Sequence, residues 1–154
     1  IMPSLVGSEM CIRDRFWRVT LVVFISYTWY CFYVPSNNII WANSYISAQN
    51  QSGQSGKPII LFFTGKWCVP CKIMKRQVWA DDQVMNIINS KFIPLAIDVD
   101  NPKNKDILVR YNVGGTPITI VTDSNGNALE WRVGGCGKSE FLELLSASNI
   151  ASNS

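Results

Sequence analysis

The sequence predicts an α/β domain in which a central mixed sheet has helices on both faces. Apolar runs of strand length alternate with segments of helical periodicity over residues 57–149, and this alternation is typical of α/β architecture. Two cysteines, Cys68 and Cys71, stand where the first apolar run gives way to a helical segment. This junction indicates where the chemistry of the domain lies.

Composition limits the classes of function open to the chain. Its 154 residues, 47% hydrophobic and 16% charged, allow one domain and one further apolar segment. The net charge of +3 is too small and too scattered to indicate a nucleic-acid partner. Histidine is absent, which excludes Ser-His and Cys-His catalysis and most zinc hydrolase sites. The 5 cysteines are an odd number, so they cannot form a complete disulfide framework.

Residues 1–15 show no periodicity of apolar side chains. Their sequence resembles translated sequencing-adapter sequence, and we interpret them as a non-native or disordered tail. Cys11 therefore receives no role.

Residues 16–34 are the candidate transmembrane anchor or signal segment. Residues 19–34 are uncharged and mostly apolar, and three arginines precede them. Arginines on this side alone predict a cytoplasmic N-terminus and an exported remainder. An uncleaved anchor is favoured, because residues 40–42 make a poor cleavage site, and a cleaved signal peptide is the alternative. Cys31 is then an apolar residue that faces the membrane.

Residues 35–56 are predicted to be a polar connection that contains a short helix. Trp41 and Tyr45 fall at helical spacing and indicate a helix over residues 39–49. Residues 51–56 are rich in Ser, Gly and Gln, which indicates a loop.

Residues 57–149 are predicted to form the folded domain. Runs of β-branched and aromatic residues predict strands over residues 58–63, 92–99, 118–122 and 128–133. Apolar spacing predicts helices over residues 68–79, 82–89, 103–111 and 139–147. Asp81 or Asp82 is the expected N-cap of the second of these helices. A tight turn at residues 124–127 is expected to join the last two strands.

Cys68 and Cys71 are predicted to be a redox-active pair without a metal. A helix N-terminus carries about half a positive charge and free amide donors, so it stabilises a thiolate over a thiol. Thiols of Cys-x-x-Cys pairs at such positions have pKa values lowered from about 8.5 to about 3.5–7.5. Cys68 is expected to be the exposed sulfur, with Cys71 one helical turn further in. The alternatives are a zinc knuckle, for which only Cys136 remains downstream as a further ligand, and a purely structural disulfide.

Two motifs make the chain resemble the thioredoxin superfamily. They are Trp-Cys-Val-Pro-Cys-Lys at residues 67–72 and Tyr-Asn-Val-Gly-Gly-Thr-Pro-Ile at residues 111–118, followed by a hairpin and a helix. The sequences FFTGKWCVPCKIMKRQVWADDQV, AIDVDNP and RYNVGGTPITIVTDSNGN are most similar to exported thioredoxin-like domains. These include the C-terminal domain of transmembrane thiol:disulfide interchange proteins. The resemblance covers residues 39–149 and implies a thioredoxin-like fold.

The resemblance assigns roles around the first motif. It implies that Cys68 attacks a substrate disulfide and that Cys71 resolves the intermediate. Trp67 is implied to shield the pair and to pack beside the substrate. Pro70 is implied to make the turn between the sulfurs rigid, and Val69 shapes the same site.

The resemblance also has a second element and one departure. Thr116 and Pro117 match the family's cis-proline, which lies against the disulfide and presents the Thr116 backbone to a substrate; an ordinary turn proline is the alternative. Cys136 is either an accessory redox thiol or a small half-buried residue. Thioredoxins bury an aspartate six residues before the first cysteine, where this chain has Phe62. The lysine that partners this aspartate is matched by Ala96.

These observations predict a thiol:disulfide oxidoreductase, most readily a reductase, that needs no cofactor because its cysteines carry the electrons. Its expected partners are disulfide-containing proteins and a transmembrane electron donor. Its expected location is the periplasmic side of the bacterial inner membrane, held there through residues 16–34, or the periplasm itself if the segment is cleaved. A reductase dedicated to one client is a narrower form of this hypothesis. A thioredoxin-like binding or chaperone module without redox turnover is the alternative, and Phe62 favours it.

Overall fold

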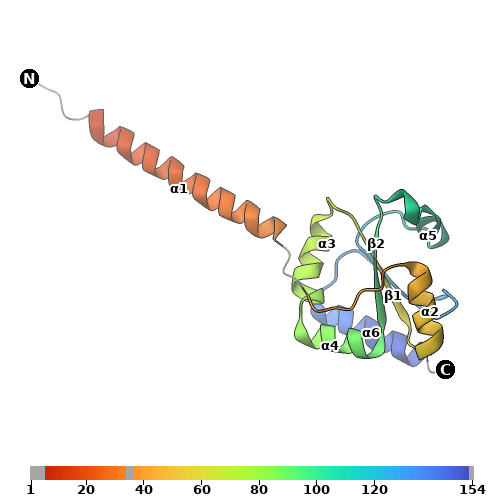
Figure 1. Ribbon diagram of the computed structural model, residues 1–154. Helices are drawn as coiled ribbons and strands as arrows, with labels where there is room; N and C mark the ends of the chain where they lie inside the picture. The colour runs from red at the N-terminus through yellow and green to blue at the C-terminus, as the bar shows by residue number, and fades with distance from the viewer. Residues whose placement is uncertain (1–5, 34–36, 153–154) are drawn as a thin grey trace, which may run out of the picture. The chain divides into compact units, whose positions relative to one another are not determined.

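The computed structural model describes residues 6–33 and 37–152 (Figure 1). The chain divides into two compact units, Ile1–Tyr33 and Val34–Ser154. Residues 1–5 of the expected tail lie outside the described residues. So do residues 34–36, where the expected membrane segment ends and the connection begins.

The first unit contains one helix, α1 (Val6–Phe32). Residues 6–15 therefore belong to this helix, where the sequence led us to expect a non-native or disordered tail. An ion pair of 2.6 Å between Arg18 and Asp14, one turn apart, supports this part of the helix. Whether these residues are native to the protein stays a prediction.

The large apolar side chains of α1 that the structure describes are exposed, among them Phe24 and Trp29. Within residues 6–33 and 37–152, no helix combines the length and the apolarity that crossing a membrane requires, and this holds for the expected span at residues 16–34 as far as it is described.

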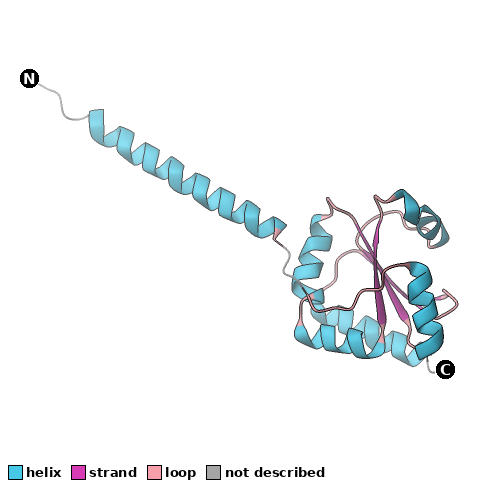
Figure 2. Ribbon diagram, viewed as in Figure 1, coloured by secondary structure: helices cyan, strands magenta, loops and turns pink. Residues whose placement is uncertain are grey.

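The second unit contains a sheet and the helices around it. In chain order its elements are α2 (Tyr45–Ser55), β1 (Ile59–Thr64), α3 (Val69–Met74), the π-helical turn η1 (Lys75–Trp79), α4 (Asp82–Lys91), β2 (Ile93–Asp98), the 3-10 turn η2 (Pro102–Asn104), α5 (Lys105–Arg110), β3 (Ile118–Thr122), β4 (Ala128–Val133) and α6 (Lys138–Ser152). Figure 2 shows strands in the middle of this unit with helices around them. The predicted α/β class is confirmed.

The sheet has the strand order β2-β1-β3-β4. Strand β1 pairs in parallel with β2 and antiparallel with β3, and β3 pairs antiparallel with β4, so the sheet is mixed. Parallel neighbours need a long crossover, and α3, η1 and α4 supply it between β1 and β2. This crossover begins at the end of β1, where the two cysteines lie.

Helices cover both faces of the sheet, which explains why every residue of β1 is buried. On one face Ile60 and Phe62 pack with residues of α3, η1, α4 and α6. On the other face Ile59, Leu61 and Phe63 pack with residues of α2 and α5. The alternation along β1 follows from the two-residue repeat of a strand. Helix α3, with Cys71, therefore lies on the face of Phe62.

Helix α2 differs from the expectation. It covers Tyr45–Ser55, whereas a helix over 39–49 and a loop over 51–56 were expected. The Ser44 side chain accepts a hydrogen bond from the Ser47 N–H, which sets the start of the helix, and Gly56 ends it at a positive φ of 70°. The residues before it run along the sheet edge, where the Ala42 N–H donates to the Pro94 carbonyl at 2.8 Å. The helical spacing between Trp41 and Tyr45 therefore does not indicate a helix at Trp41.

The other elements follow the sequence pattern closely. Strands β3 and β4 have the predicted bounds. Asp81 is the N-cap of α4, and its carboxylate accepts hydrogen bonds from the N–H groups of Gln83 and Val84. Helix α6 ends five residues later than predicted, since its last residues carry a weaker apolar pattern.

Candidate redox site

The two cysteines form a disulfide at the junction of β1 and α3. The bond between Cys68 and Cys71 has an S–S distance of 1.95 Å, a χ3 angle of 79° and a Cα–Cα distance of 5.2 Å. Both sulfurs therefore belong to one site, as the sequence predicted.

Local hydrogen bonds shape this site. Cys68 is the N-cap of α3, and its Sγ accepts a hydrogen bond from the Cys71 N–H at 3.1 Å. The Cys68 N–H donates to the Gly65 carbonyl at 3.2 Å, which closes the turn after β1. Pro70 occupies the first turn of the helix, where a missing N–H costs nothing and a fixed φ helps.

The two cysteines differ in exposure. Cys71 is 1% exposed and packs with Phe62 and Met74 in the core, whereas Cys68 is partly exposed. Trp67, directly before Cys68, is 85% exposed. An incoming protein can therefore reach Cys68 and Trp67 but not Cys71. Val69 is also exposed beside them.

The second predicted motif reaches the same end of the domain. The Thr116–Pro117 peptide bond is cis, and Pro117 is buried. Its carbonyl accepts a hydrogen bond from the Gly134 N–H at 2.8 Å. A Cβ atom on Gly135 would lie 3.9 Å from the Cβ of Pro70. The segment after β4 thus connects the proline element to the turn between the cysteines.

Cys136 lies on that connecting segment. It is a free thiol, half-buried, and packs against the same core cluster as Cys68. Burial raises the pKa of its thiol, and Arg132 opposes this rise. A raised pKa lowers the thiolate population, so Cys136 is less reactive than an activated thiol. Its role as an accessory thiol stays a prediction.

The departure at Phe62 is borne out by the sheet. Phe62 and Ala96 are partners in the β1–β2 register, as expected. Phe62 is fully buried, and Ala96 is exposed. An aromatic ring, and not a carboxylate, therefore occupies this position in the core cluster that also contains Cys71.

Two charged residues near the site were missed by the sequence reasoning. The Asp100 carboxylate accepts a hydrogen bond from the Lys66 N–H at 3.3 Å, just before Trp67. The Nζ of Lys75 lies 5.8 Å from the centroid of the Phe62 ring. The position of Lys75 four residues after Cys71 was the available signal, because such residues share a helix face.

In the part of the chain that the structure describes, no three or more His, Cys, Asp or Glu side chains form a group that could hold a metal ion. The site consists of the sulfurs, the surrounding backbone and the side chains named above.

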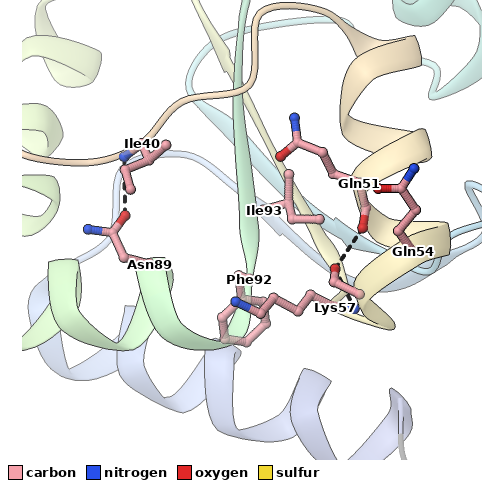
Figure 3. Close-up of a pocket in the computed structure, with 8 residues that line it drawn as sticks. Ile40, Gln51, Gln54, Lys57, Asn89, Phe92 and Ile93 are labelled. Atoms are coloured by element: carbon pink, nitrogen blue, oxygen red, sulfur yellow. Dashed lines mark hydrogen bonds between the residues drawn. The ribbon is translucent and has the colours of Figure 1, made fainter.

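A cavity of about 320 Å³ lies apart from this site (Figure 3). Its lining includes Gln51 and Gln54 of α2, Asn89 of α4, and Phe92 and Ile93 at the start of β2. Asn89 joins its walls, since its side-chain oxygen accepts a hydrogen bond from the Ile40 N–H at 3.1 Å. No cysteine lines it, so it is not part of the redox site.

The mixed sheet, its helices and the disulfide at the start of α3 define a thioredoxin-like domain with a Cys-x-x-Cys site. Residues 46–149 match the thioredoxin-like domain family, and the chain belongs to this family. The resemblance predicted from the sequence is confirmed.

Curated relatives agree with this assignment. The chain is 31% identical over 103 residues to the thiol:disulfide interchange protein DsbD 1 of Pseudomonas aeruginosa, which covers 63% of this chain and 17% of that protein. It is 35% identical over 94 residues to DsbD of Ralstonia nicotianae, covering 59% of this chain and 15% of the relative. The chain therefore spans less than a fifth of the length of these relatives.

Solved structures share the fold. A thioredoxin from Thermus thermophilus superposes with a TM-score of 0.67 at 22% identity, covering 74% of this chain and 89% of that one. The oxidised C-terminal domain of Neisseria meningitidis DsbD superposes with a TM-score of 0.59 at 20% identity, covering 71% and 98%. The DsbH oxidoreductase gives a TM-score of 0.61 at 26% identity, covering 76% and 88%.

Proposed function

We propose that the chain reduces disulfide bonds in exported proteins. The observation that carries this proposal is the unequal exposure of two bonded cysteines, with Cys68 accessible and Cys71 buried behind it. In the reduced protein, the Cys68 thiolate attacks one sulfur of a substrate disulfide and displaces the other sulfur as a thiolate. The Cys71 thiolate then attacks the Cys68 sulfur, which releases the second substrate thiol and forms the Cys68–Cys71 disulfide. Two electrons pass to the substrate.

The substrate is proposed to lie between Trp67 and the backbone of Thr116. The 85% exposure of Trp67 leaves its ring free for contact with a protein. An extended substrate segment would pair with the chain before Pro117 as an added strand. Disulfide-containing proteins are therefore the proposed substrate class.

The proposed reaction leaves the protein oxidised, so a dithiol donor must reduce it again. Similarity to DsbD thiol:disulfide interchange proteins supports partners that exchange disulfides with this chain, and the proposed donor is a transmembrane protein of this kind. Three arginines precede the apolar part of α1, and no charged residue follows until Lys57. This asymmetry supports delivery of the domain to the periplasm by residues 16–34, either as an anchor or as a cleaved signal. Membrane fractionation and the mass of the mature protein distinguish these two forms.

The redox potential of the Cys68–Cys71 pair tests the proposed direction of the reaction. The full chain is equilibrated in dithiol buffers with the other three cysteines, Cys11, Cys31 and Cys136, replaced by serine. A potential near or below about −230 mV is expected for a reductase. A potential of about −120 to −180 mV would contradict this direction and indicate an oxidant or an isomerase.

Turnover separates the reductase from the alternative binding module. Reduction of a protein disulfide by the wild type, lost in both Cys68→Ser and Cys71→Ser, is expected. The binding module would be supported instead if the wild type did not turn over, and if it bound unfolded protein no better than the variant in which Cys68 and Cys71 are both replaced by serine.

A further inference from the structure

The resolving thiol lies in an apolar environment that disfavours its reactive form. Cys71 is 1% exposed, and its core neighbours include Phe62 and Met74. Burial in an apolar cluster favours the neutral thiol over the thiolate. In the proposed exchange reaction, however, Cys71 attacks as a thiolate. A nearby group must therefore stabilise its negative charge.

Lys75 is placed to do this. It begins η1, one turn after Cys71, and its backbone N–H donates to the Cys71 carbonyl. Long helical side chains point back over the preceding turn, which for Lys75 is the turn that contains Cys71. Its Nζ lies 5.8 Å from the centroid of the Phe62 ring, and this ring packs in the same core cluster as Cys71.

The charges that face Lys75 come from two elements. Asp98 of β2 attracts its ammonium group, and Lys72 of α3 repels it. Asp98 pairs in register with Thr64, two residue pairs beyond the Phe62–Ala96 pair. Residues two apart on a strand share a face, so Asp98 belongs to the same face of the sheet as Phe62. Partial burial lowers the pKa of Lys75, and Asp98 opposes this effect.

We propose that the ammonium group of Lys75, held over the Phe62 ring, acts as a positioning residue that raises the thiolate population of Cys71. This inference rests on the exchange reaction proposed above. The proton that leaves the Cys71 thiol passes to the thiolate displaced from the substrate in the first step, and Lys75 keeps its own proton throughout. No further reactant is needed. The sheet contributes the uncharged side chain of Phe62 to the surroundings of the resolving cysteine. The cation that stabilises the thiolate of this cysteine therefore comes from the helical segment.

The test follows the two steps of exchange separately in the full chain, with Cys11, Cys31 and Cys136 replaced by serine. Reduced protein is mixed with dithiobis(nitrobenzoate). Attack by Cys68 releases one coloured thionitrobenzoate, and attack by Cys71 on the resulting mixed disulfide releases the second. The rates of both phases are measured against pH for the reference protein, which keeps both lysines, and for its variants Lys75→Met, Lys75→Arg and Lys91→Met. Lys91 is an exposed lysine at the end of α4 and controls for loss of a charge.

We expect Lys75→Met to slow the second phase about tenfold at neutral pH, because loss of a nearby opposite charge shifts a pKa by about one unit or more. The pH profile of the second phase should move to higher pH, with the first phase less affected. Lys75→Arg should restore the profile, and Lys91→Met should superimpose on the reference. Equal second-phase profiles for Lys75→Met and Lys91→Met would overturn the proposal.

A measurement of folding and a replacement variant keep the result decisive. Near-ultraviolet circular dichroism establishes that each variant is folded, and Lys75→Gln replaces Lys75→Met if the latter does not fold. The small disulfide reagent requires no protein substrate. A chain that resolves the reagent normally but reduces no protein would contradict the proposed function and leave the inference about Lys75 standing.

Discussion

The indole ring of Trp79 packs against the ring of Phe62 with their centroids 4.9 Å apart. Trp41 and Phe141 also contact Trp79, at centroid distances of 4.9 and 5.0 Å. Trp79 is fully buried and ends the helical segment that starts at Val69, directly after Cys68. This ring therefore joins the helix of the redox site to the sheet, to α6 and to the segment before α2.

Trp79→Ala should lower the free energy of unfolding by about 3–5 kcal/mol, because it leaves a cavity that several elements surround. Chemical denaturation of the oxidised protein measures this loss. Trp79→Phe should lose less, since it keeps an aromatic ring in the cluster. If both variants lost the same free energy of unfolding, the packing of an aromatic ring at this position would not be what keeps the helix in place.

Trp67→Ala should leave stability within about 0.5 kcal/mol of the wild type, because a side chain that is 85% exposed has little packing to lose. It should nevertheless slow the reduction of a protein disulfide several-fold. Parallel assays with a protein substrate and a small organic disulfide separate substrate contact from chemistry. Equal slowing with both would assign Trp67 to the chemistry of the sulfurs and not to substrate contact.

Gly126→Ala should destabilise the domain by about 1–3 kcal/mol or more. Gly126 has a φ of 82°, and a Cβ there would lie 2.5 Å from the Tyr45 hydroxyl and 2.8 Å from Nη2 of Arg110. The Tyr111 hydroxyl also donates to the Gly126 carbonyl at 2.9 Å. Thermal unfolding measures the effect. Gly53→Ala is the control, since its helix position has open space and a stabilising change is expected there.

Asp81 should make stability depend on pH below about pH 4, near its ordinary pKa. A hydrogen bond from Lys138 at 2.8 Å lowers the pKa of this carboxyl, and the N–H groups of Val84 and Gln83 add to the effect. Since the folded-state pKa is below the unfolded value, this stabilisation is present above the unfolded pKa. It is lost as pH falls through the folded pKa.

Asp81→Asn keeps a capping side chain but removes the charge. Its melting temperature should therefore lie below that of the wild type at neutral pH, and the difference should vanish in acid. A difference that persists unchanged at low pH would show that the cap, and not the charge, is responsible. Lys138→Met should reproduce the loss at neutral pH.

The elements of the sheet were readable from local patterns. Strands β3 and β4 carry their β-branched and aromatic residues between clear turn residues, and their bounds agree with the prediction. The start of α4 followed from the capping side chain of Asp81. These features depend on neighbours in the sequence, which is why the sequence reveals them.

Helix α2 was misplaced because its bounds depend on contacts beyond the local pattern. Ser52 looks like a loop residue, yet it is buried and its hydroxyl donates to the Lys57 carbonyl at 2.6 Å. Trp41 has helical spacing to Tyr45, yet it packs on Trp79 from an extended segment. In both cases the burial of the side chain, and not the local helix propensity, decides whether the residue lies in a helix.

By itself the sequence determined the position of the cysteine pair, because Cys68, Pro70 and Cys71 lie on a single helical turn whose geometry is local. It also determined that Phe62 replaces a carboxylate. The tertiary structure decided where the ammonium group of Lys75 lies. Lys75 is four residues from Cys71 in the chain, but its place over Phe62 and its attraction to Asp98 exist only once β1 and β2 are paired beneath the helix. Electrostatic effects on a buried thiol depend on distances through space, and folding alone sets these distances.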